Sequence, residues 1–123
     1  MLSGRILAES LRVGADLNLP ELRLTRISRD DVSASSSPSQ PDVFTVLDVE
    51  APDELAEELA NALSAALIAG PCWYADFRVG GDHVIVFPGR VFRYTEGDRA
   101  GRQEAVDYGA ALGIPHNQLD WGN

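Results

Sequence analysis

The chain has 123 residues, of which 45% are hydrophobic and 24% are charged, and this composition predicts one globular α+β domain spanning residues 1–123. Nineteen acidic against ten basic residues give a formal net charge of −9, which argues against nucleic acid and anionic membrane surfaces as partners. Because no apolar run is long enough for a signal peptide core or a membrane span, we expect a cytoplasmic protein.

The N-terminal third predicts two strands. Apolar residues alternate along residues 5–13, which favours a first strand. Residues 22–29 alternate as well, but Ile27 falls out of phase, which is typical of a β-bulge. The polar, low-complexity run at residues 33–41 buries too little apolar surface to be ordered, so we expect a flexible surface loop.

The clearest helix follows a third strand. Residues 43–49 form a nearly continuous apolar run, which predicts a strand buried on both faces. Pro52 suits a helix start, and the acidic residues among 53–58 match the positive end of the helix dipole. Gly70 and Pro71 predict its end. The apolar stripe of this helix consists of Leu55, Leu59, Leu63 and Leu67.

Residues 73–94 predict a three-stranded meander, because the turn pairs at 80–81 and 88–89 separate its apolar runs. With two-residue turns, His83 lies opposite Arg78 on one side and opposite Tyr94 on the other. One face of the meander carries only apolar residues and should meet the helices: Trp73, Ala75, Phe77, Val79, Val84, Val86 and Val91. The other face is too apolar to face water alone, and it carries Tyr74, Asp76, Arg78, His83, Ile85, Phe87, Phe92 and Tyr94.

A second helix is predicted to begin near Asp98, with Thr95 as its cap, and to end at residues 113–115. The large residues Leu119 and Trp121 predict a tail that docks back on the domain. The helix has an apolar stripe rich in small residues, suited to close packing on a sheet: Gly101, Ala105, Tyr108, Gly109 and Leu112.

The predicted element order is β-β-β-α-β-β-β-α. This order is typical of a two-layer α+β sandwich with a largely antiparallel sheet and two helices on one face. Residues 43–87 also follow the β-α-β-β order of a ferredoxin-like half. Such folds carry too many functions to indicate one.

The C-terminal half contains the motifs WYADF at 73–77, VFPGRVFRY at 86–94 and LDW at 119–121. In these motifs the chain resembles a group of small acidic proteins from GC-rich bacteria. The resemblance implies a bacterial protein. It implies no activity and no catalytic residue, because no function is known for that group.

Catalytic and cofactor motifs are absent from the sequence. The turn at 80–81 lacks the lysine of a P-loop, and no serine stands in Gly-x-Ser-x-Gly. His83 and His116 lack the spacing of metal ligands. Cys72 is the only cysteine, and without a neighbouring base it predicts an inert thiol. We therefore expect no cofactor, no metal and no catalytic residue.

The candidate binding face is the second face of the meander. Arg78 could hold a carboxylate or phosphate there, with His83 as acid or base. The alternative is a cross-strand Asp–Arg pair with His83 packed on Tyr94. The candidate residues are Tyr74, Asp76, Arg78, His83, Phe92 and Tyr94.

Three functions fit these patterns. The first is a non-enzymatic interaction module, either a homo-oligomer such as a homodimer or an acidic partner or inhibitor of a basic protein. The second is a small-molecule-binding domain that uses Arg78, His83 and Tyr94. The third is an enzyme with His83 as its acid–base group. In each case we expect the aromatic face to be covered by the N-terminal strands, the tail or a second copy.

Overall fold

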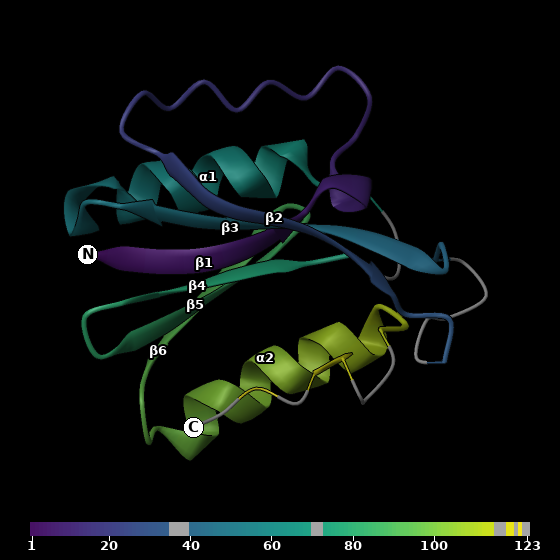
Figure 1. The fold of residues 1–123 in the computed structure, drawn as a ribbon. Coiled ribbons are helices and arrows are strands. Elements are labelled where there is room, and N and C mark those ends of the chain that lie inside the picture. The colour runs from purple at the N-terminus through teal and green to yellow at the C-terminus, as the bar shows by residue number, and fades with distance from the viewer. Residues whose placement is uncertain (35–39, 70–72, 115–117, 120, 122–123) are drawn as a thin grey trace.

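In the computed structural model, which describes residues 1–34, 40–69, 73–114, 118, 119 and 121, six strands form one sheet in the order β2-β3-β1-β4-β5-β6 (Figure 1). All neighbouring strands are antiparallel, so the predicted α+β class and antiparallel sheet are confirmed. The elements are β1 (Leu2–Leu7), β2 (Arg23–Asp31), β3 (Val43–Ala51), α1 (Ala56–Ala66), β4 (Ala75–Val79), β5 (Asp82–Phe87), β6 (Arg90–Thr95) and α2 (Arg99–Ala111).

The first helix packs as its leucine stripe predicts. Leu55, Leu59, Leu63 and Leu67 are all buried, and α1 with one face of the sheet forms a two-layer sandwich (Figure 1). The helix ends at Ala66, before the predicted stop, because Leu67 turns extended and bridges to Leu11. Gly70 and Pro71 lie outside the described residues.

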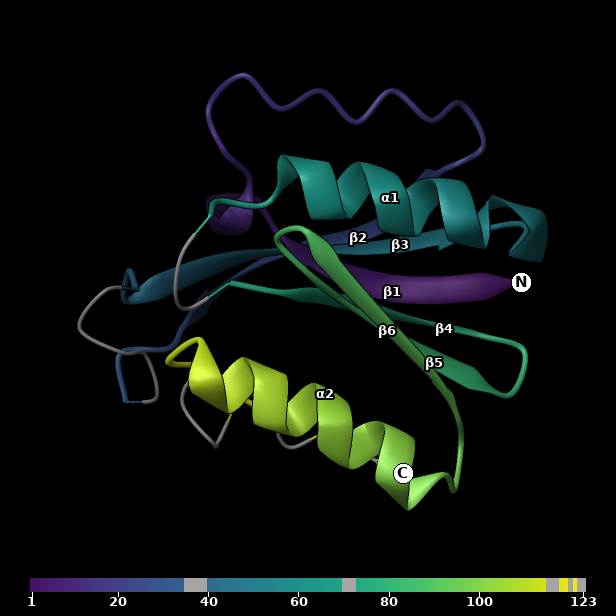
Figure 2. The same ribbon diagram turned by 180° about the vertical axis from the view of Figure 1, so that it is seen from behind.

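The second helix lies on the opposite face of the sheet, so the prediction that both helices share one face is wrong (Figure 2). Alternation along β5 explains the difference. Val84 and Val86 pack toward α1, whereas Ile85 and Phe87 pack toward α2. A short continuous apolar run is typical of a strand covered on both faces, and residues 84–87 are such a run.

The N-terminal strand differs from its predicted range. β1 occupies Leu2–Leu7 and lies between β3 and β4, and a 3-10 turn at Ala8–Ser10 ends it. Glycine at position 4 lets the neighbouring strand β4 approach closely, because a Cβ there would clash with the Cβ of Phe77. The predicted bulge in β2 is confirmed between Leu24 and Arg26.

Helix α2 packs closely, as its small residues predict. A Cβ at Gly101 would lie 2.7 Å from the Tyr94 Cβ, and one at Gly109 would lie 2.7 Å from the Leu119 Cδ2. Asp98 caps the helix by accepting a hydrogen bond from the Gly101 amide at 3.1 Å, so the predicted Thr95 cap is wrong. Thr95 instead ends β6, where its hydroxyl bonds to Asp82.

Three predictions concern segments outside the described residues: most of the 33–41 loop, which is undescribed at 35–39, and the environments of Cys72 and His116.

Across the described ranges, no helix combines the length and apolar character needed to cross a membrane.

Candidate functional site

The structure divides the predicted binding face into a covered part and an open part. Helix α2 and the tail cover the part over β5 and β6, where Leu119 is 2% and Trp121 is 8% exposed. The predicted docking of the tail is thereby confirmed. The covered candidates are Tyr74, His83, Phe92 and Tyr94, whereas Asp76 and Arg78 border an open groove.

His83 lies at the boundary between the two parts. Its side chain is 1% exposed, with Nε2 2.7 Å from Asp76 Oδ2 and Nδ1 3.0 Å from the Tyr94 hydroxyl. A carboxylate can only accept, so the satisfied arrangement has Nε2–H donating to Asp76 and the Tyr94 hydroxyl donating to Nδ1. Both ring nitrogens are therefore occupied within the chain.

Asp76, His83 and Tyr94 are linked in the order acid, histidine and hydroxyl that is found in catalytic triads. Their surroundings, however, do not suit catalysis. Tyr94 stands where a nucleophile would stand, and its side chain is 4% exposed. Burial is the main cause that raises the pKa of Tyr94, which disfavours its phenolate. The arrangement leaves no open side on which a substrate could reach a ring nitrogen of His83. Its geometry is that of a buried polar network that fixes side chains.

A second network fastens the tail to the sheet. The Trp121 indole N–H donates to the Tyr74 oxygen at 3.2 Å, and the Tyr74 hydroxyl donates to the Gln118 carbonyl. Arg102 on α2 donates to the Trp121 carbonyl from Nε and Nη2, at 3.0 and 2.8 Å. Burial, aided by the charge of Asp76, raises the pKa of the Tyr74 phenol. The tail is thus held by directed bonds as well as by apolar packing.

Phe92 is part of the chain's own aromatic cluster. Its ring contacts Phe87 at 5.8 Å and Tyr108 at 5.4 Å between centroids, and the Arg90 guanidinium lies 4.7 Å over it. The aromatic face is therefore closed by α2 and the tail of the same chain. It does not need a second copy to shield it from water.

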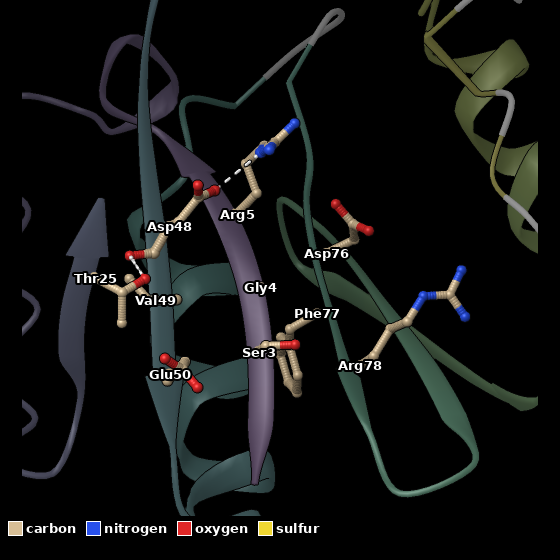
Figure 3. Close-up of a pocket in the computed structure, with 10 residues that line it drawn as sticks. All are labelled: Ser3, Gly4, Arg5, Thr25, Asp48, Val49, Glu50, Asp76, Phe77 and Arg78. Atoms are coloured by element: carbon tan, nitrogen blue, oxygen red, sulfur yellow. Dashed lines mark hydrogen bonds and ion pairs between the residues drawn. The ribbon is translucent and has the colours of Figure 1, made fainter. Parts of the chain in front are cut away.

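The open part is a shallow groove of about 430 Å³ over β3, β1 and β4, with Thr25 of β2 at its edge (Figure 3). Helix α2 packs over β5 and β6, away from β3 and β1. The groove is lined by Ser3, Gly4, Arg5, Thr25, Asp48, Val49, Glu50, Asp76, Phe77 and Arg78.

Charges of opposite sign alternate across the strands on this side of the sheet. Cross-strand pairing forms two rows, Arg26–Asp48–Arg5–Asp76 and Arg23–Glu50–Ser3–Arg78. Arg5 Nε lies 3.0 Å from Asp48 Oδ1, and a dashed line marks this ion pair in Figure 3. Because the two signs alternate, the groove presents no single-sign field to a phosphate or to a cation.

Sequence reasoning missed this groove. The polar residues Ser3 and Arg5 alternate with apolar neighbours, as do Asp48 and Glu50, so each strand signals one polar face. Their meeting depends on β1 lying between β3 and β4, which local patterns do not specify. Among the described residues, no three His, Cys, Asp or Glu side chains are placed to hold a metal ion.

Comparisons with family models, with curated proteins and with solved structures found none that matches this chain.

Proposed function

We propose that the protein is a non-enzymatic interaction module that binds a polypeptide along the uncovered side of its sheet. The binding surface consists of the free edge of β2 and the adjoining groove over β3, β1 and β4. The exposure of β2 carries this proposal: the strand pairs only with β3 in the described part of the chain, and only Ser28 among its nine residues is even half-buried.

A free strand edge is a ready binding element. Its outward amides and carbonyls can pair with an added strand, and neighbouring side chains supply specificity. β2 also exposes two large apolar side chains, Leu24 at 52% and Ile27 at 60%. The alternating charges of the groove favour a partner of complementary pattern and disfavour other partners.

The enclosure of His83 supports binding over catalysis. This histidine is the acid–base group of the predicted face, and both of its nitrogens bond within the chain. Of the residues predicted for a small-molecule site, Arg78 is the one that a ligand could still reach. It is an exposed side chain at the rim of the groove, and it forms no ion pair within the described ranges. His83 and Tyr94 are not accessible to such a ligand.

The test compares affinity capture by the wild type with capture by two variants. Ile27→Lys places a charge on β2, and Val13→Lys makes the same change at another exposed apolar residue, outside the sheet. Tagged chains are incubated with an extract of cells that make the protein, and bound polypeptides, including untagged copies of the chain, are quantified by mass spectrometry.

We expect a polypeptide retained by the wild type and by V13K to be lost with I27K, because a charge on β2 opposes strand addition. If all three chains retain the same set of polypeptides, the free edge of β2 is not a binding surface and the proposal fails.

A further inference from the structure

We infer that the partner is a second copy of this chain, joined by antiparallel pairing of the two β2 strands about a two-fold axis. This inference rests on the proposed function and names its partner. Pairing of this kind would continue one sheet through both copies and would bury the free β2 edge of each copy.

The bulge in β2 limits where a second strand can pair. The register with β3 shifts between Leu24 and Arg26 and is then regular from Arg26 to Asp31. A bulge disrupts the ladder, so an added strand has residues 26–31 available. A two-fold axis places one residue opposite its own copy, and Ser28 and Arg29 are the two residues nearest the centre of this segment.

The charges of β2 favour the register that is centred on Ser28 over the one centred on Arg29, which would place the arginine opposite its own copy. Three arginines, at 23, 26 and 29, precede two aspartates, at 30 and 31. An antiparallel copy reverses this order. With Ser28 at the centre, Arg26 lies opposite the partner's Asp30, and by symmetry Asp30 lies opposite the partner's Arg26. The register centred on Ser28 therefore forms two ion pairs.

The two residues of each ion pair share a face of the sheet. Arg26 pairs with Asp48 and Asp30 pairs with Phe44, and these β3 residues are four apart, so they point to the same side. Neither Arg26 nor Asp30 forms an ion pair within the described ranges, so both are available to a partner. Directly opposed charges of opposite sign stabilise an antiparallel pair.

The opposite face of β2 would gain apolar cover in this register. Ile27 lies opposite the partner's Arg29, whose aliphatic stem can pack over the exposed isoleucine. The other edge strand offers no equivalent. β6 carries Arg90 and Arg93 without an acidic residue, and Arg93 already bonds to Asp82 at 2.7 Å. Self-complementary charge is therefore a property of the β2 edge.

The test exchanges the charges of the proposed pairs and follows association by sedimentation equilibrium over a wide concentration range. Arg26→Asp makes positions 26 and 30 both acidic, and Asp30→Arg makes them both basic. Each variant alone opposes like charges twice in the dimer, and we expect its dissociation constant to rise roughly tenfold or more.

Two rescues separate this effect from misfolding. An equimolar mixture of R26D and D30R should form a heterodimer, because the acidic strand of one then faces the basic strand of the other. The double variant R26D/D30R should dimerise like the wild type, because its pairs are merely reversed. The control Arg99→Asp, an exposed residue of α2 with the same charge change as R26D, should leave the wild-type dimer intact.

A wild type that stays monomeric at the highest concentration overturns the inference, and so does a dimer that neither rescue restores. In the first case the arginines, aspartates and bulge serve only to protect a free edge. The capture experiment then decides the fate of the proposed function separately. Loss of another polypeptide with I27K would retain the interaction module with a different partner, whereas unchanged capture would remove both.

Discussion

The two halves of one sheet face differ in what covers them. Over β5 and β6 the face is aromatic, and α2 and the tail of the same chain enclose it. Over β3 and β1, and along β2, the face carries alternating charges and remains open. An aromatic-rich sheet face in this protein therefore indicates intramolecular packing, and the open groove lies where the face is polar and charged.

The contrast extends to single strands. β5 is buried at five of its six residues, whereas β2 has none that is fully buried. Packing should make β5 essential for stability, while β2 contributes little beyond its ladder with β3. Substitutions in the two strands should consequently differ in size by several kcal/mol.

The largest effect is expected for Phe87→Ala in the covered half. Phe87 is fully buried, and its ring contacts those of Tyr74, Phe92 and Tyr108. Removing it leaves a cavity, and the free energy of unfolding should fall by about 3–5 kcal/mol. Urea denaturation measures this loss. A loss below about 1 kcal/mol would mean that α2 does not pack on this face.

An intermediate effect is expected from alkaline titration of the tail network. Burial raises the pKa of Tyr74 above its usual value of 10.0, so the folded state keeps the neutral phenol while the unfolded chain ionises. The stability that this burial contributes is complete below pH 10 and is lost as the pH rises above it. The tail network should therefore weaken in alkali.

The measurement for this prediction is the urea midpoint on either side of pH 10. It should fall more steeply for the wild type than for Tyr74→Phe, which has no phenol to ionise at this position. Identical slopes would show that Tyr74 is exposed to water and that the tail does not enclose it.

The smallest effect on stability is expected for Ile27→Ala on the exposed strand β2. This side chain is 60% exposed, so the free energy of unfolding should change by less than about 0.5 kcal/mol at protein concentrations where the chain is monomeric. Thermal or urea denaturation of the dilute protein measures it. A loss comparable with that of Phe87→Ala would place Ile27 in a core and would remove the contrast.

Much of the fold could be predicted from local sequence. The glycine-containing turns predicted how the three strands of the meander pair, and the structure confirms the pairs Arg78–His83 and His83–Tyr94. Gly80 and Gly89 have positive φ angles, which few other residues adopt. Glycine at these positions is therefore a sequence signal from which the turns can be predicted. The leucine stripe of α1 could also be predicted from neighbouring residues alone.

The arrangement of the elements could not be predicted in the same way. β1 enters between β3 and β4, which joins chain segments more than forty residues apart, as in the pair Arg5–Asp48. The candidate site depends on this insertion, so its groove was missed. The apolar run at residues 84–87 did signal a strand covered on both faces, and it could have placed the two helices on opposite sides.

Amide hydrogen exchange of the wild type, measured at low and at high protein concentration, tests most directly the claim that the chain seals one half of this face and binds through the other. We expect β5 amides to exchange slowly at both concentrations, because α1 and α2 cover the strand. Amides on the free edge of β2 should exchange fast in dilute solution and slow down as copies pair. Fast exchange in β5, or free-edge amides of β2 that are already protected in the dilute monomer, would contradict the account.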